Sequence, residues 1–109
     1  MPFFRKRAVT QDGVTVMVSG LLNLQVEEFL ASQQAIFEDK ETPATDRAKK
    51  LEETWLAFVC QGMKNANPES AVDPKSVLLD YEKQFLLDVV KPVIMEMSNI
   101  GMRGEVLSA

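Results

Sequence analysis

The sequence predicts a mainly α single domain, residues 1–109, of three to four helices with a short N-terminal β-hairpin. A length of 109 residues allows one hydrophobic core of modest size. Hydrophobic residues make up 46% of the chain and charged residues 26%, which is the balance of a globular protein. Apolar residues alternate only near the N-terminus and afterwards recur every three to four positions, which favours helices.

Residues 3–18 are predicted to form the hairpin. Residues 10–13, Thr-Gln-Asp-Gly, supply the turn, and Gly13 can adopt the positive φ angle that a tight turn requires. The second strand places three valines on one face: Val14, Val16 and Val18. The first strand carries three consecutive basic residues: Arg5, Lys6 and Arg7. Charges at such a position are typical of an edge strand, because they oppose pairing with other chains.

The first helix is predicted over residues 19–38, with Ser19 as its N-cap. Its apolar stripe comprises Leu22, Val26, Phe29 and Ile36. Residues 39–46 are polar and contain a proline, so we expect them to connect this helix to a second one over residues 46–64. The second helix is apolar on nearly every side over residues 55–63, which is typical of a helix at the centre of a core.

The third helical region is predicted over residues 74–100. Asp73 followed by Pro74 is a strong start signal, since Asp favours the N-cap and proline favours the first helical position. Pro92 is expected to break or kink this helix, because its ring removes one donor and clashes with the preceding turn. Gly101 is the expected residue after the helix end, and residues 101–109 are predicted to form a flexible tail.

The charge balance and the single cysteine narrow the possible environments and partners. The net charge of −4 disfavours nucleic-acid binding, and no apolar run approaches the roughly 20 residues of a membrane helix. Cys60 has no second cysteine with which to pair, which favours a reducing cytoplasm. We therefore expect a cytoplasmic protein with neither a nucleic-acid nor a membrane partner.

The residues needed for common catalytic chemistry are scarce. The chain contains no histidine, so Ser-His-Asp arrangements and imidazole metal sites are excluded. Ser19-Gly20 joins a strand to a helix as a phosphate loop would, but it offers one glycine and no nearby lysine. Adjacent carboxylates such as Glu52 and Glu53 favour a solvated face, although a catalytic pair from different helices stays open. We expect no enzyme, no cofactor and no metal site.

The stretch DGVTVMVSGLLNLQ, residues 12–25, resembles the N-terminal region of the tail assembly chaperones of lambda-like long-tailed phages, the minor tail protein G family. These proteins carry a strand of the form G-V-T-V followed by S-x-L-x-x-L-Q at the first helix. The matching positions are Gly13, Val14, Thr15, Val16, Ser19, Leu21, Leu24 and Gln25. The later part of the chain is similar in layout, with an apolar second helix and a loop that contains Asn and Pro.

The resemblance implies a protein without enzymatic activity that works in the host cell cytoplasm and is absent from the mature virion. It implies binding to the tape measure protein, which is kept soluble and ready for assembly of the tail tube. It also implies self-association, and a frameshift-extended form that recruits the tail tube protein. The alternative is a different class of protein, a structural head-tail connector or another component of virion morphogenesis.

A chaperone for a long helical client needs exposed apolar strips rather than a deep pocket. The first two helices offer Phe29, Phe37 and Trp55 for this role, and Met95 and Met97 form a second candidate surface. Methionine side chains are flexible enough to adapt to varied partners. We expect these five residues to contribute to partner binding.

Overall fold

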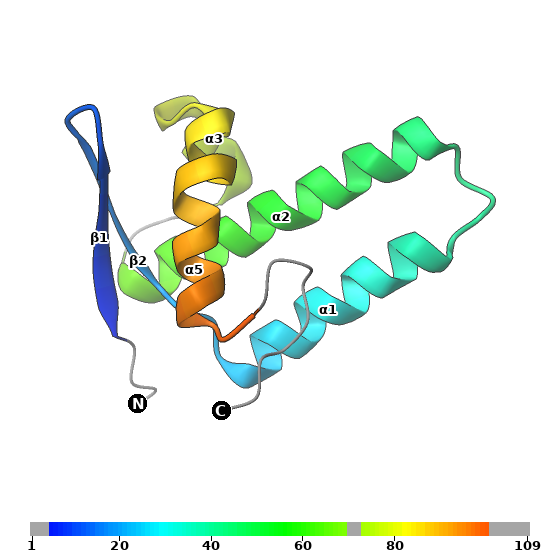
Figure 1. Ribbon diagram of the computed structural model, residues 1–109, viewed down its shortest axis with the longest axis horizontal. Coiled ribbons are helices and arrows are strands. Elements are labelled where there is room, and N and C mark those ends of the chain that lie inside the picture. Colours follow the sequence, from blue (N-terminus) through cyan, green and yellow to red (C-terminus); the bar gives the residue numbers. More distant parts are fainter. Residues whose placement is uncertain (1–4, 70–72, 101–109) are drawn as a thin grey trace.

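The computed structural model describes residues 5–69 and 73–100 of the chain (Figure 1). Two antiparallel strands come first and helices follow, so the predicted mainly helical fold with an N-terminal hairpin is confirmed. None of the described helices is long and apolar enough to cross a lipid bilayer.

The hairpin joins β1 (Lys6–Gln11) to β2 (Val14–Ser19). Asp12 and Gly13 have φ angles of 52° and 81°. Positive φ angles at both central residues suit a two-residue hairpin turn, because they match the twist of the strands. Val9 pairs with Val16, and both side chains are buried, so one face of the hairpin contributes to the core as predicted.

The first helix, α1 (Asn23–Glu38), begins four residues later than predicted. Ser19 is not its cap, because it ends β2, pairs with Lys6 in the ladder and is buried. The first turn of α1 is instead capped by Gln25, whose side-chain oxygen accepts a hydrogen bond from the Leu22 N–H at 2.9 Å. The strand therefore continues through the position that the sequence assigned to the helix cap.

The second helix, α2 (Ala44–Ala66), runs back along α1 and then enters the core. Its buried residues all lie in the second half, which confirms the predicted central position of this segment: Leu56, Phe58, Val59, Cys60, Gly62, Met63, Asn65 and Ala66. Gly62 permits close packing, since a Cβ atom there would lie 2.6 Å from the side chain of Ile94.

The third helical region consists of a short helix, an extended break and a longer composite helix. In α3 (Pro74–Asp80) the Asp73 side chain accepts a hydrogen bond from the Ser76 N–H at 2.9 Å, which confirms the predicted start. Tyr81 then adopts extended backbone angles, φ −133° and ψ 146°. The helix resumes without interruption through α4 (Lys83–Phe85), the π-helical segment η1 (Leu86–Val90) and α5 (Lys91–Met97).

Pro92 was expected to break or kink the helix; the break is contradicted, because the chain stays helical on both sides of the proline. The Lys91 N–H donates to the Leu86 carbonyl, five residues back, which is the wider π-helical pattern. A π turn before the proline relieves the contact between its ring and the preceding carbonyl groups.

α5 ends at Met97, and the C′ residue is Asn99 rather than Gly101. Asn99 has a φ angle of 61°, and the Ile100 N–H donates to the Met95 carbonyl at 2.9 Å. The Asn99 N–H donates to the Glu96 carbonyl at 3.1 Å, so the two bonds form a Schellman motif with asparagine at C′. Gly101 and the predicted flexible tail, residues 101–109, lie outside the described residues.

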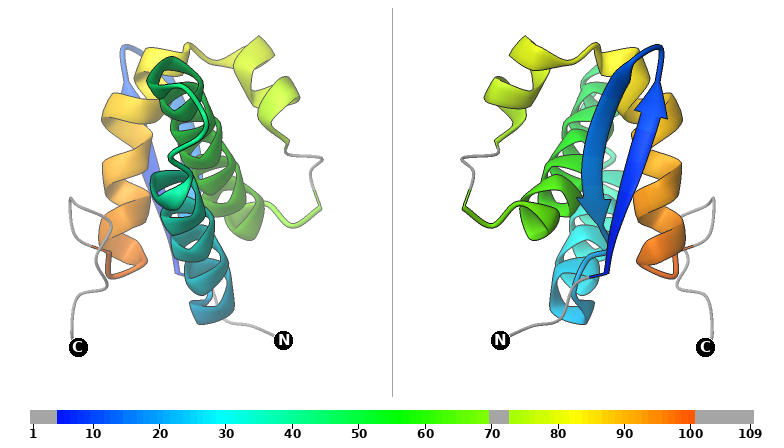
Figure 2. Two further views of the ribbon diagram at one scale, coloured as in Figure 1. Left: turned by 90° about the vertical axis from the view of Figure 1, so that its right-hand side faces the viewer. Right: turned by 90° about the vertical axis from the view of Figure 1, so that its left-hand side faces the viewer.

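The core lies between the hairpin, the second half of α2 and the composite helix. Figure 2 shows the hairpin against α2 on one side and α5 on the other. The largest fully buried side chains belong to these elements: Phe58, Leu86, Ile94, Val18, Val59 and Val90. We call this part of the molecule the body.

Candidate functional site

The distal halves of α1 and α2 extend away from the body as a helical hairpin, which we call the arm, residues 30–55 (Figure 1). No residue of the arm is fully buried. In α1 only Val26 and Phe29 are buried, and both precede the arm. The arm is therefore held by packing of two helices against each other, with most of its remaining surface open to contact.

An aromatic cluster fixes the base of the arm. The ring centroid of Phe29 lies 4.7 Å from that of Trp55 and 4.7 Å from that of Phe58. The Trp55 and Phe58 rings pack edge-to-face with centroids 5.3 Å apart. The Lys91 ammonium lies 4.4 Å from the centre of the Trp55 ring, so α5 also contacts this cluster. Such tilted and edge-to-face contacts stabilise packing beyond the area that they bury. The arm therefore starts from a rigid base.

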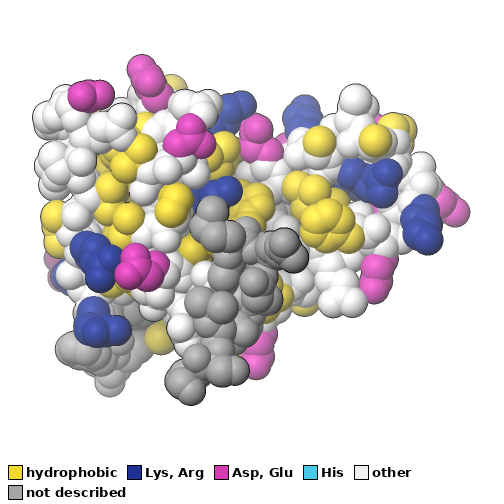
Figure 3. Space-filling model, viewed as in Figure 1, with side chains coloured by type: hydrophobic (Ala, Val, Ile, Leu, Met, Phe, Trp, Pro, Cys, Tyr) yellow, Lys and Arg dark blue, Asp and Glu magenta, His cyan; other side chains and the backbone are white. Residues whose placement is uncertain are grey.

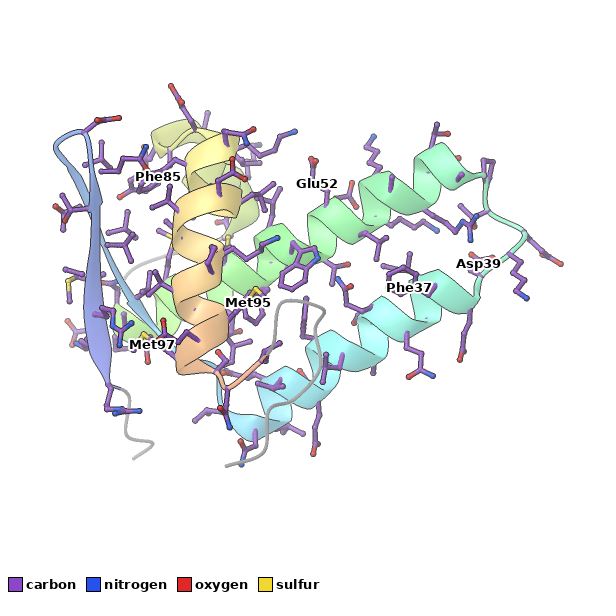
Figure 4. All side chains as sticks on the ribbon, in the orientation of Figure 1. Phe37, Asp39, Glu52, Phe85, Met95 and Met97 are labelled. Atoms are coloured by element: carbon purple, nitrogen blue, oxygen red, sulfur yellow. The ribbon has the colours of Figure 1, made fainter. Side chains whose placement is uncertain are left out.

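Phe37 is the largest exposed apolar side chain near the end of the arm, with 62% of its surface accessible. It borders a shallow hollow of about 190 Å³ whose lining consists of Ile36, Phe37, Ala44, Arg47, Ala48 and Leu51. Figure 3 shows hydrophobic side chains over the arm, flanked by lysine and arginine. Figure 4 places Phe37 between the two helices, close to the connecting loop.

The loop at the end of the arm is ordered by Asp39. Its Oδ1 atom accepts hydrogen bonds from the N–H groups of Glu41 and Thr42 at 3.2 and 3.3 Å. The Thr42 hydroxyl donates to Oδ2 at 2.5 Å, and this bond is the main reason that the pKa of Asp39 is lowered. Three hydrogen bonds to one carboxylate therefore order the connection between α1 and α2.

The five residues expected to bind a partner do not form one surface. Phe37 is exposed and Trp55 is half-buried, and both lie on the arm. Phe29 is only 7% exposed and Met95 only 3%, so neither side chain is available to a partner in this structure. Met97 is half-buried and packs against the core from α5. We therefore remove Phe29 and Met95 from the candidate surface, because the aromatic cluster and the core already occupy them.

Two exposed leucines were missed by sequence reasoning. Leu24 is 65% exposed at the start of α1, and Leu79 is 81% exposed on α3. The sequence does not predict the end of α3, because the residues around Tyr81 include neither glycine nor proline. A continuous helix was therefore expected, with its apolar side chains, including Leu79, packed against the core.

The Ser19-Gly20 junction is a structural joint. A Cβ atom at Gly20 would lie 2.5 Å from the Met97 carbonyl oxygen, so the end of α5 requires glycine here. The Leu21 N–H donates to the Ser98 hydroxyl at 2.9 Å. The buried Asn65 amide donates to the Gly20 carbonyl at 3.1 Å and to the Gln25 side-chain oxygen at 2.9 Å. These bonds join β2, α1, α2 and the end of α5 at one point.

Cys60 and Glu52, two of the side chains considered for chemistry, both lie on α2. Cys60 is buried, as predicted, and burial raises the pKa of its thiol to about 11, so the reactive thiolate is scarce near neutral pH. Glu52 pairs with Lys83 at 2.9 Å on the surface. Within residues 5–69 and 73–100, no group of three or more metal-binding side chains is placed to hold an ion.

No known protein family model matches the chain. The curated proteins and the solved structures likewise contain no match.

Proposed function

We propose that this protein is a tail assembly chaperone of a lambda-like phage that acts in the host cell cytoplasm. In this role it binds the tape measure protein, keeps it soluble and promotes assembly of the tail tube. The resemblance over residues 12–25 motivates the proposal, and the exposed apolar surface of the arm carries it.

The arm suits a long helical client for a geometric reason. Two antiparallel helices form a groove between them, and a third helix can pack there through apolar side chains spaced three and four residues apart. Phe37 and Leu51 provide apolar contacts in the hollow of this groove, and the half-buried Trp55 lies nearer the body on α2. The contacts are shallow, so many copies can each bind weakly and release the client as the tube forms.

Charges around the groove favour selectivity without tight binding. Lys40, Lys49 and Lys50 are exposed on or near the end of the arm, and Glu27, Glu28 and Glu38 are exposed along α1. Exposed ion pairs contribute little affinity, but they orient a partner and suppress mismatched ones. A client helix with acidic and basic residues on either side of an apolar stripe would match this distribution.

The experiment is co-expression with the tape measure protein encoded by the same phage, followed by a solubility assay and pull-down. We expect a soluble complex with the wild-type chain. Phe37→Ser combined with Leu51→Ser should reduce recovery of the complex. Leu79→Ser is the matched control, because this leucine is also exposed but lies on α3, outside the arm.

Failure to recover a complex, together with an insoluble tape measure protein, would contradict the proposal. Mass spectrometry of purified virions then distinguishes the alternative. A head-tail connector remains in the particle, whereas an assembly chaperone is lost before maturation. A longer, frameshifted product that captures the tail tube protein would extend the proposal.

A further inference from the structure

A second hollow, which we call the turn cavity, lies at the hairpin turn beside the break between α3 and α4. It has a volume of about 330 Å³, and its apolar lining is formed by Val14, Tyr81 and Phe85. Figure 4 shows Phe85 between the composite helix and the hairpin. The volume falls at the low end of the range of roughly 300–1,000 Å³ seen for ligand pockets.

Two aromatic rings form one wall of the turn cavity. The rings of Tyr81 and Phe85 are stacked, with centroids 6.1 Å apart and an interplanar angle of 27°. Both side chains are only half-buried, whereas Phe29 and Phe58 are buried in the aromatic cluster. Part of each ring of the cavity is therefore accessible, and a planar group or a cation can pack against it.

The polar lining of the turn cavity is acidic. Among the described residues it contains three exposed carboxylates and no lysine or arginine: Asp12, Asp80 and Glu82. None of the three forms an ion pair with a described residue. Lys83 follows Glu82 in the chain, but its ammonium lies 2.9 Å from the Glu52 carboxylate. An occupant that complements the lining therefore brings positive charge.

Arginine is the side chain that matches both parts of this lining. Its guanidinium is planar and stacks on aromatic rings, and its N–H groups form paired hydrogen bonds with carboxylates. It is also more weakly hydrated than the ammonium of lysine, so less hydration is lost when it enters a partly apolar cavity. Lysine would bring the charge without the planar contact to the rings.

Exposed apolar side chains continue beyond the turn cavity. Val14 is 41% exposed at its edge, and Leu79, which precedes Asp80 in the chain, is 81% exposed. A peptide segment can cover these side chains with the residues on either side of its arginine. A free amino acid would leave them in water, so the surface favours a segment of a protein.

We propose that the turn cavity binds an arginine side chain presented by a partner protein. The guanidinium packs against Tyr81 and Phe85 and donates hydrogen bonds to the carboxylates of Asp80 and Glu82. The turn cavity and the arm lie at opposite ends of the molecule (Figure 1). The site therefore does not depend on the proposed function of the arm.

The test is an NMR titration of the isotope-labelled full-length chain with a synthetic peptide, acetyl-Gly-Leu-Arg-Leu-Gly-amide. Two matched peptides replace the arginine with lysine or with citrulline, which has nearly the same shape and no charge. We expect saturable shifts of the backbone amides in residues 11–14 and 80–85. The lysine peptide should bind at least about threefold more weakly than the arginine peptide, and the citrulline peptide should not saturate.

A substituted chain tests the cavity side of the contact. Asp80→Asn with Glu82→Gln keeps the side-chain shapes and removes two charges, so the dissociation constant should rise on the order of tenfold or more. Glu27→Gln with Glu28→Gln on α1 is the matched control, since it removes the same charge outside the cavity, and it should bind the peptide like the wild type. Circular dichroism checks that both variants are folded.

Four results would overturn the proposal. The arginine peptide could give no saturable shift up to millimolar concentration, or its shifts could lie outside the turn cavity. The citrulline peptide or the substituted chain could show unchanged affinity. Free arginine could bind as tightly as the peptide, which would assign the cavity to a small molecule. Recovery of a complex through the arm is a separate measurement, so either proposal can fail without the other.

Discussion

The body and the arm contain the same kinds of apolar residue but use them differently. In the body, Phe58, Leu86 and Ile94 are almost completely buried between the hairpin, α2 and the composite helix. In the arm, α1 and α2 pack against each other and no further element covers them, so most of the Phe37 surface is accessible. An apolar stripe therefore becomes core only where a further element covers it, and elsewhere it remains available for binding.

The largest expected effect follows from removing a body side chain. Phe58→Ala should lower the free energy of unfolding by about 3–5 kcal/mol, because Phe58 is 2% exposed and contacts both other rings of the aromatic cluster. Chemical denaturation monitored by circular dichroism measures this change. A loss as small as that of an exposed residue would mean that the cluster does not support the body.

A smaller effect is expected at the joint between strand and helix. Gly20→Ala places a Cβ atom against the backbone of Met97, which cannot move as a flexible side chain would, so we expect a loss of about 1–3 kcal/mol. Gly13→Asn is the control, since nothing lies within 4 Å there and asparagine tolerates a φ angle of 81°. Equal stability of the two variants would show that α5 does not approach Gly20 closely.

Much of the body could be predicted from the sequence because its signals are local. Asp12-Gly13 specifies the turn, and Asp73 specifies the start of α3. Tertiary contacts and local helix geometry determine the two features that the sequence did not predict, the end of β2 and the continuous helix around Pro92. Ser19 extends β2 because it pairs with Lys6, and the π turn before Pro92 keeps the helix continuous.

The candidate binding surface was harder to predict, because the sequence does not show which apolar faces a further element covers. Periodicity marks which side chains share a face, but it does not tell whether another element covers that face. Phe29 and Phe37 lie on the same helix, yet one closes the aromatic cluster and the other is exposed. Met95 was similarly assigned to a surface although α5 buries it in the body.

The arm itself should tolerate loss of its exposed ring. Phe37→Ser should change the free energy of unfolding by no more than about 0.5 kcal/mol, because Phe37 is 62% exposed. Under the proposed function, binding of the tape measure protein should fall in the same variant, which separates an effect on binding from an effect on stability. Phe29→Ser is the contrasting variant and should reduce both. Equal destabilisation by the two substitutions would place Phe37 in a covered core.

The smallest effect is expected at the end of the arm, in the loop ordered by Asp39. Hydrogen bonding, chiefly from the Thr42 hydroxyl, lowers the pKa of the Asp39 carboxyl from its ordinary value of 3.8. A lowered pKa in the folded state means that the ionised group stabilises the fold above the unfolded-state pKa. This stabilisation is lost as the pH falls through the folded-state value.

Asp39→Asn keeps the shape of the side chain and removes the charge, so it isolates this contribution. Wild type should be slightly more stable than the variant at pH 7, and the difference should shrink once the pH falls below about 3.8, as denaturation at each pH will measure. A difference that grows on acidification would contradict the assigned sign. The hydrogen bonds of Asp39 run to the N–H groups of Glu41 and Thr42 within the loop, so hydrogen exchange should report the change there while α5 stays protected.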